Sequence, residues 1–339
     1  MTTEHDGVRD LLAAWAFGAL PPAEERTVPP HLAECGTCAA EAERLRETVR
    51  LLDGTGARDT AERSADGVLA AALARRRPAA HRVAEHAAPY AAAVSGLAAL
   101  LREAEGRWDT PVVHGWDVRD TVAHLLAADE HLALPLGLRA RAPLTAVPDT
   151  RWQDAWSRRT ADVIAHEHGR TPRHTVGSWS AQADALLGTP EARDPAPAAR
   201  TVTLTGVRLP VADHFLVRAF ETWIHTGDIG RALGFAVPPP PEDHLGRLVR
   251  LAVRVLGMTA PGTTSSPPVR LSVTGGEEWV LGGGDGADGP VCAELALDPV
   301  DLCLLVGGRQ TPDAVPRHST GDERAVRHVL ERAAALAWL

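Results

Sequence analysis

The stretch "RAFETWIHTGDIG", residues 218–230, is the most informative about the fold of this chain. In it, ionisable side chains interrupt an otherwise apolar segment at a regular interval. An α-helix advances about 100° per residue, so these side chains fall on one narrow stripe of a single helix. The stripe consists of His214, Arg218, Glu221, His225 and Asp228. Because buried charges are costly unless they are paired or bound to a metal, we expect a buried helix over 209–233 whose stripe faces an internal cleft.

Two interpretations of the stripe remain open. Glu221 and His225 are one helical turn apart, and a carboxylate oxygen together with an imidazole nitrogen suits Zn²⁺ or a similar divalent ion. Alternatively, the stripe is a ladder of salt bridges in which Arg218 pairs with Glu221 and Asp228 holds His225. The spacing alone favours neither interpretation.

Length and composition limit the possible classes of protein. The 339 residues suffice for two or three domains, and the formal net charge of -9 does not indicate a nucleic-acid-binding surface. The chain has no lysine and no asparagine, a bias that resembles the coding of a GC-rich actinobacterium. Since the N-terminus lacks a signal-peptide core and no apolar run could span a bilayer, we expect a cytoplasmic protein with no membrane or direct nucleic-acid contact.

The chain is predicted to be mainly α-helical, with three domains. Residues 1–77 should form a small helical domain and residues 82–236 a bundle of long amphipathic helices. Residues 238–339 should form an α+β domain, because "VRLSVTG" alternates like a strand and "EEWVLGG" follows as its hairpin partner. The breaks between domains are "RRRPAAH" (75–81) and "FAVPPPPED" (235–243).

Helices are expected over segments whose apolar residues recur with helical spacing. In the first domain these segments are 7–20, 23–26, 31–52 and 58–75. In the bundle they are 82–104, 117–134, 150–168, 176–187 and 209–233. In the last domain a helix should cover 241–257, and another should follow the Gly-Asp pair near the C-terminus.

The segment "HLAECGTC", residues 31–38, carries a candidate metal site. On one continuous helix His31, Cys35 and Cys38 would share a face, so all three could reach one ion. A closed tetrahedral site needs a fourth ligand, and His5 is the nearest candidate. In the cytosol a C-x-x-C pair is more often metal-binding or redox-active than a structural disulfide. We therefore predict a zinc site rather than two incidental cysteines.

This segment resembles the zinc-binding anti-sigma domain. "HDGVRDLLAAWAFGALPPAEER" followed by "HLAECGTCAAEAERLR" matches that family's pattern through most of the first 50 residues. The chain departs from the pattern at Pro29 and Pro30, although proline suits the first turn of a helix. The resemblance implies that residues 1–77 bind a sigma factor. It also implies that oxidation of the Cys35 and Cys38 thiolates could release the partner, as in some members.

A second resemblance concerns the bundle. "GWDVRDTVAHLLAADEHL", residues 115–132, places His124 in an apolar helix, and the R-x-x-E-x-x-x-H-x-x-D pattern of residues 218–228 follows later. Together they resemble the DinB-like bundle of mycothiol-dependent maleylpyruvate isomerases over roughly residues 83–236. The resemblance extends into residues 240–339 through "DLCLLVGGR" and "STGDERAVRHVL".

That resemblance implies a second metal site, with His124, Glu221 and His225 as ligands of an ion that is usually zinc. Three protein ligands leave a position for water or for the thiol of mycothiol. Asp228 would orient His225 from outside the ligand shell. His131 ranks below His124 as a ligand.

Two arginines have roles that the same resemblance suggests. Arg218 would neutralise a carboxylate or hold Glu221. Arg309, in "GGR", matches an arginine that the family uses at its substrate site, so it is the candidate catalytic residue. The alternative for Arg309 is an arginine in a surface loop.

Three functions compete on this basis. We favour an anti-sigma-factor-like regulator with two zinc sites, whose bundle senses or uses a low-molecular-weight thiol such as mycothiol. The alternative is a mycothiol-dependent isomerase or thiol S-transferase that acts on a small substrate and carries an accessory zinc module. The third function, a degenerate bundle that serves only as a scaffold, is disfavoured by the intact set of His124, Glu221 and His225.

Overall fold

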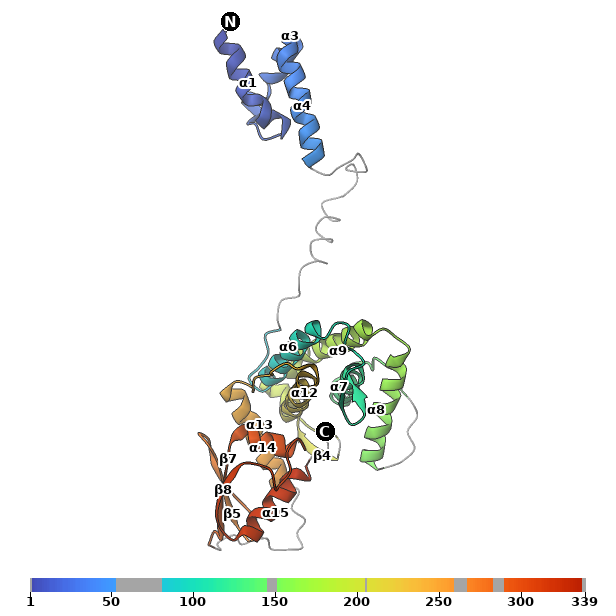
Figure 1. The fold of residues 1–339 in the computed structure, drawn as a ribbon, viewed down its shortest axis with the longest axis vertical. Helices are drawn as coiled ribbons and strands as arrows, with labels where there is room; N and C mark the ends of the chain where they lie inside the picture. The colour runs from blue at the N-terminus through green and yellow to red at the C-terminus, as the bar shows by residue number, and fades with distance from the viewer. Residues whose placement is uncertain are drawn as a thin grey trace. The chain divides into compact units, whose positions relative to one another are not determined.

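The computed structural model describes residues 2–52, 81–144, 151–204, 206–258, 267–282 and 290–336 (Figure 1). It divides into two compact units, Met1–Ala79 and Ala80–Leu339. The predicted mainly helical chain with an α+β C-terminal part is confirmed. The helix expected at 58–75 lies outside the described residues, as does all of the 75–81 break except His81. The division of the second unit into domains at 236–238 stays a prediction.

The first unit is small and helical. Its described helices are α1 (Thr2–Ala16), α2 (Pro22–Glu25), α3 (Val28–Glu34) and α4 (Gly36–Leu52). Helix α1 packs against α3 and α4. The buried core consists of Val8, Leu12, Val28, Cys38 and Ala42. A core of this size contributes little stability, so a unit like this one usually needs a metal ion or disulfides.

The single helix predicted over 31–52 is wrong at its beginning. Cys35 has an extended backbone, with φ -118° and ψ 98°, and its N–H donates to the His31 carbonyl at the end of α3. A new helix, α4, begins at Gly36. Pro29 and Pro30 lie in the first turn of α3, where proline is tolerated. The bend at Cys35, rather than one helical face, therefore brings His31 and the two cysteines together.

The second unit contains the predicted helix bundle, and each predicted long helix is found with shifted ends. Its helices are α6 (Ala88–Glu103), α7 (Val118–Ala133), α8 (Trp152–His168), α9 (Pro172–Leu187) and α12 (Val211–Leu233). Helix α12 packs along α6, and α7 packs against α8, α9 and α12. Short elements connect them: β1 (Pro111–Val113), β2 (Trp116–Asp117), η1 (Leu134–Leu136), α10 (Pro190–Arg193), α11 (Pro195–Ala198), β3 (Thr201–Leu204) and β4 (Val207–Pro210).

Helix α12 lies in the middle of this unit, as the apolar circumference of "RAFETWIHTGDIG" predicts. The five side chains of its polar stripe are only 0–6% exposed. The helix ends at Gly234, whose φ of 77° belongs to the left-handed region that favours glycine. Directly after this end the chain turns back against the last turn of α12, where Phe235 N–H donates to the Gly230 carbonyl.

This close approach makes Gly230 sensitive to substitution. A Cβ at Gly230 would lie 2.4 Å from Val237 Cγ2 and 3.0 Å from the Phe235 carbonyl oxygen, whereas a Cβ at Gly227 would meet nothing within 4 Å. We expect Gly230→Ala to lower the free energy of unfolding by about 1–3 kcal/mol through overpacking. Gly227→Ala, the matched control on the same helix, should be neutral or stabilising. Equal stability of the two variants in denaturant titrations would contradict this packing.

The C-terminal part of the second unit is α+β. It contains α13 (Glu242–Met258), β5 (Val269–Val273), β6 (Glu278–Leu281), β7 (Ala293–Leu297), α14 (Pro299–Val306), β8 (Arg317–Gly321) and α15 (Glu323–Ala334). The sheet order is β6-β5-β7-β8, with β5 and β7 parallel and the other pairs antiparallel. The predicted hairpin is therefore confirmed. Strand β8 was not predicted, because "RHSTG" lacks an apolar alternation.

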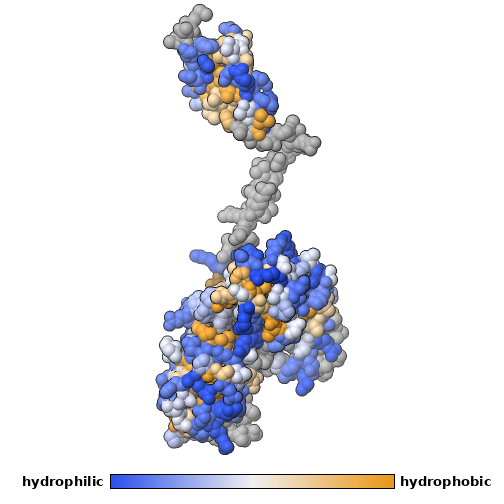
Figure 2. All heavy atoms as spheres, viewed as in Figure 1, coloured by the Kyte–Doolittle hydropathy of each residue, from blue (hydrophilic) through white to orange (hydrophobic). Residues whose placement is uncertain are grey.

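The surface of both units mixes hydrophilic and hydrophobic side chains on the face drawn in Figure 2. Two large apolar side chains of the first unit are strongly exposed, Phe17 at 61% and Leu51 at 74%. None of the described helices combines the length and the hydrophobicity needed to cross a membrane.

Candidate metal centres

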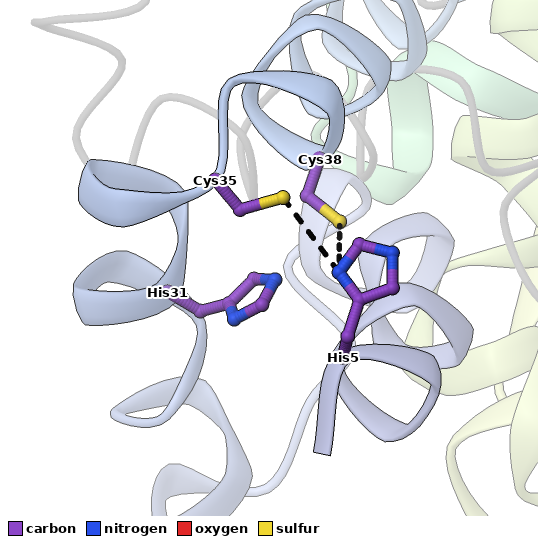
Figure 3. Close-up of side chains that lie close together, drawn as sticks. All are labelled: His5, His31, Cys35 and Cys38. Carbon is purple, nitrogen blue, oxygen red and sulfur yellow. Dashed lines mark hydrogen bonds between the residues drawn. The ribbon is translucent and has the colours of Figure 1, made fainter. Parts of the chain in front are cut away.

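The first candidate centre lies in the N-terminal unit. His5 comes from α1, His31 from α3, Cys35 from the bend and Cys38 from α4, and their side chains converge (Figure 3). Each offers one ligand atom, and these atoms lie within 4.8 Å of one another. His5 Nδ1 is 3.6 Å from Cys35 Sγ and 3.7 Å from Cys38 Sγ. The structure thus brings together all four residues that the sequence suggested.

The donor set of this cluster is suited to zinc. Two sulfur and two imidazole donors match a closed tetrahedral structural site. His31 Nε2 is buried without a hydrogen-bond partner among the described residues, so a lone pair there is available to an ion. A hydrogen bond from the Cys38 backbone contributes most to lowering the pKa of Cys35, whereas burial raises the pKa of Cys38. At least one thiol is therefore predisposed to the thiolate form that binds metals.

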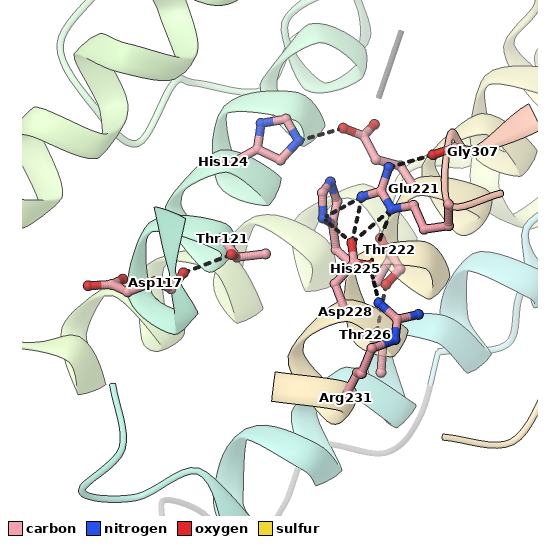
Figure 4. Close-up of polar contacts among 11 residues, drawn as sticks. Asp117, Thr121, His124, Glu221, Thr222, His225, Thr226, Asp228, Arg231 and Gly307 are labelled. Atoms are coloured by element: carbon pink, nitrogen blue, oxygen red, sulfur yellow. Dashed lines mark hydrogen bonds and ion pairs between the residues drawn. The ribbon is translucent and has the colours of Figure 1, made fainter. Parts of the chain in front are cut away.

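The second candidate centre lies in the bundle. His124 on α7 faces Glu221 and His225 on α12, and their ligand atoms also lie within 4.8 Å of one another (Figure 4). His124 Nε2 is 2.8 Å from Glu221 Oε1, and the two histidine rings are 4.9 Å apart between centroids. All three side chains are at most 1% exposed. Two imidazoles and a carboxylate at this spacing form a three-donor set of the kind found in catalytic zinc sites.

Further contacts hold the bundle cluster from outside. His225 Nδ1 lies 3.2 Å from Asp228 Oδ2, while His225 Nε2 is buried with no hydrogen-bond partner among the described residues. If Nδ1 carries the proton and donates it to Asp228, the Nε2 lone pair is free for an ion. Glu221 also contacts Arg218 through its other oxygen.

Both interpretations of the stripe therefore have support in the contacts. The ion pairs of the ladder, Arg218 with Glu221 and Asp228 with His225, are present. These ion pairs do not occupy every ligand atom of the cluster. Glu221 also contacts His124, and His225 Nε2 has no hydrogen-bond partner among the described residues. The pairs thus orient the same side chains that could hold a metal.

The electrostatics of the cluster favour neutral imidazoles. Burial, together with the nearby positive charges of Arg218 and Arg309, lowers the pKa of His124 to about 3. Burial likewise lowers the pKa of His225 to about 3, although Asp228 opposes the shift. Neutral imidazole is the form that binds a metal ion, so both side chains are ready to coordinate near neutral pH.

Arg309 lies in the turn after α14, and its side chain is buried against Asp228. Its side chain is 8% exposed and donates to Asp228 through Nε, at 3.2 and 3.1 Å, and through Nη2, at 2.5 Å. The surface-loop alternative is therefore wrong. Arg309 also lies in the wall of a cavity of about 310 Å³ between α12 and α14, and none of the three clustered residues lines that cavity. Its part in catalysis stays a prediction.

Several other side chains of the bundle are not among the clustered ligand atoms. Trp116, on the short β1–β2 hairpin, stacks on the His124 ring at 4.6 Å between centroids. His131 stacks on Trp156 at 4.5 Å and is not among the clustered ligand atoms, which agrees with its lower rank. Asp129, one helical turn before Ala133 on α7, is fully buried. Its position directly after the apolar run "LLAA" could have indicated this burial from the sequence.

The contacts of Asp228 lead to a graded prediction. Asp228→Asn should weaken metal binding in the bundle about 10–100-fold without abolishing it, because it disturbs the orientation of His225 but removes no ligand. Arg231→Gln is the matched control, since the 67%-exposed Arg231 side chain also contacts Asp228 and such exposed pairs contribute little. Zinc titration against a chelator measures both affinities. Equal affinities for the two variants would contradict the role of Asp228.

Two family models match the parts of the chain in which the candidate centres lie. Residues 6–39 match a family model described as "Putative zinc-finger", and residues 87–230 match the "Mycothiol maleylpyruvate isomerase N-terminal domain". The first range includes Cys35 and Cys38, and the second includes His124, Glu221 and His225. A search of curated proteins gave no significant match.

Two solved structures are similar to this chain. One is the mycothiol-dependent maleylpyruvate isomerase, with 17% identity and a TM-score of 0.48, and the other is a mutant of such an enzyme, with 16% identity and the same score. Each comparison covers 70% of this chain and 93% of the other.

The chain therefore combines two recognisable modules. Its N-terminal segment matches a zinc-finger family of the anti-sigma type, and a segment that matches the mycothiol maleylpyruvate isomerase N-terminal domain follows in the same chain. The predicted resemblance to these two families is confirmed.

Proposed function

We propose that this protein is a zinc-binding regulator of the anti-sigma type. Its N-terminal unit would hold zinc through His5, His31, Cys35 and Cys38 and bind a sigma factor. The observation that carries the proposal is the convergence of these four donors from three helices and a bend, three of them inside the segment 6–39 that matches the zinc-finger model and His5 directly before it. A closed four-donor cluster is the arrangement of a structural ion, which stabilises a fold and leaves the helices to bind the partner.

The surface of the N-terminal unit supports a protein partner. Phe17 and Leu51 are large apolar side chains that remain strongly exposed on a unit with few buried ones. Exposed apolar side chains of this size contribute binding energy when a partner covers them. The formal net charge of -9 for the chain argues against DNA as that partner.

The bundle would sense or use a low-molecular-weight thiol, with mycothiol as the candidate. Its support is the buried set of His124, Glu221 and His225 in a segment that matches the mycothiol maleylpyruvate isomerase domain. Three protein donors leave a coordination position for an exogenous ligand. A divalent ion bound there would lower the pKa of a coordinated thiol.

The same three-donor set supports a second candidate function. A buried His₂Glu set with neutral imidazoles suits metal-assisted catalysis, so the chain could be a mycothiol-dependent isomerase or S-transferase with an accessory zinc module. Thiol-dependent turnover by the full chain that persists after Cys35→Ser and Cys38→Ser would favour this enzyme over the regulator.

Capture of a sigma factor tests the regulator directly. The full chain should retain a sigma factor encoded beside its own gene, and a truncation lacking residues 1–77 should lose it. Glu221→Ala is the matched control, because it alters the bundle and leaves the N-terminal donors intact. Undiminished capture by the truncation would contradict the assignment of the partner to the first unit.

A further inference from the structure

A second buried polar group lies beside the bundle cluster and is not explained by the proposed ligands. It consists of Tyr90 on α6, Asp129 on α7 and Arg218 on α12, which are 0%, 0% and 6% exposed. The Tyr90 hydroxyl donates to Asp129 Oδ2 at 2.7 Å. A buried carboxylate is costly unless a positive charge and hydrogen bonds compensate it, so the presence of Asp129 in the core needs a physical reason.

Arg218 connects this group to the metal cluster. One of its terminal nitrogens, Nη2, donates to Glu221. The other, Nη1, is buried without a hydrogen-bond partner among the described residues, and so is Asp129 Oδ1. Burial lowers the pKa of Arg218, and the charge of Asp129 is the strongest influence that raises it again. The positive charge of Arg218 therefore acts on two buried carboxylates, through an ion pair with Glu221 and through electrostatic attraction to Asp129, and only Glu221 is a candidate metal ligand.

The charge balance changes when a divalent ion is added to such an arrangement. The ion would share the Glu221 carboxylate with Arg218, and it would also repel the guanidinium because both are positive. In a water-poor interior this repulsion is poorly screened, so Arg218 needs another negative partner close by. Besides its ion-pair partner Glu221, Arg218 is influenced by the negative charge of Asp129, which raises the pKa of the guanidinium.

We propose that Asp129, held in place by Tyr90, is the counter-charge of Arg218 in the metal-loaded bundle and thereby sets the metal affinity of a site that it does not touch. The inference rests on the proposed His124, Glu221 and His225 site. Asp129 is a positioning residue in this account, because it acts through Arg218 on the ligand Glu221. Such outer partners commonly change metal affinity about 10–100-fold.

The neighbouring residue provides a matched control. Glu130 lies next to Asp129 on the same helix and is 1% exposed, but its carboxylate pairs with Arg159 at 2.5 Å. Asp129→Asn and Glu130→Gln each remove one buried negative charge from α7 and preserve the side-chain volume. A purely structural role would make the two substitutions alike in their effects.

The experiment measures Zn²⁺ affinity by chelator competition in the full chain carrying Cys35→Ser and Cys38→Ser, so that only the bundle binds. Asp129→Asn should weaken binding about 10–100-fold, while Glu130→Gln should leave it within about twofold. In an Arg218→Gln background, Asp129→Asn should have no further effect beyond about twofold, because its route to the metal is gone. The Co²⁺ absorption spectrum of the loaded protein should stay unchanged in Asp129→Asn, since no ligand is lost.

The outcomes separate this inference from the proposed site. If the parent chain binds no Zn²⁺, the metal site itself is wrong and the inference falls with it. If the parent binds and Asp129→Asn binds equally well, only the inference is wrong. Should Asp129→Asn not fold, Tyr90→Phe removes only the hydroxyl that holds Asp129 and should still weaken binding, whereas unchanged affinity in that variant would overturn the proposal.

Discussion

Glu221→Ala will remove the metal from the bundle and leave the N-terminal centre loaded. Glu221 is fully buried between His124 and Arg218, and it supplies the only carboxylate of the cluster. Loss of an outer partner already costs about 10–100-fold in affinity, so loss of a ligand should cost more. The substitution also leaves Arg218 buried without its ion-pair partner, which should destabilise the unit by about 3–5 kcal/mol.

Glu221→Gln separates the two effects of that substitution. The amide keeps the volume of the side chain and can still hydrogen-bond with His124, so stability should fall less than in Glu221→Ala. Metal affinity should nevertheless fall steeply, because a neutral amide is a poor ligand for zinc. Retention of wild-type zinc affinity by Glu221→Gln would contradict the ligand set and favour a structural salt-bridge ladder.

Combining Cys35→Ser with Cys38→Ser will unfold the first unit and spare the second. The first unit has a buried core of only five residues, one of which is Cys38 itself. Zinc binding contributes an apparent free energy of about 10–16 kcal/mol in structural zinc peptides. Because the core of the first unit is so small, this energy determines whether the unit folds. In the second unit the core is extensive and includes neither cysteine.

Hydrogen exchange followed by mass spectrometry measures both units in one experiment. Peptides from α1 and α4 should lose protection in the double variant, and peptides from α7 and α12 should keep theirs. Cys292→Ser is the control, because this thiol donates to the Pro268 carbonyl and lies outside both clusters. Persistent protection of α1 and α4 in the double variant would show that the first unit folds without its metal.

Much of the bundle site could be predicted from the sequence because helical spacing is local. The period of the stripe on 214–228 places Glu221 and His225 on one face whatever the rest of the chain does. The apolar neighbours of His124 likewise predict that it is buried. The partner relations of Asp228 with His225 and of Arg218 with Glu221 are also local, since each spans three residues along α12.

Contacts between distant segments could not be predicted in the same way. The pairing of Arg309 with Asp228 joins residues 81 positions apart, and that of Tyr90 with Asp129 joins residues 39 positions apart. No periodicity encodes either one. The bend at Cys35 could not be predicted for a different reason, because Ala and Glu occur on both sides of it and suggest one helix. The extended backbone of Cys35 allows the four donors of the cluster to converge, and this is a property of the folded unit rather than of the local sequence.

The most direct test of this account is a count of metal ions per chain. Purified wild-type protein, supplemented with zinc and freed of excess, should carry two equivalents by elemental analysis. The Cys35→Ser and Cys38→Ser double variant should carry one, Glu221→Ala should carry one, and their combination none. A wild-type chain that binds one equivalent or none would contradict the presence of two separate metal centres.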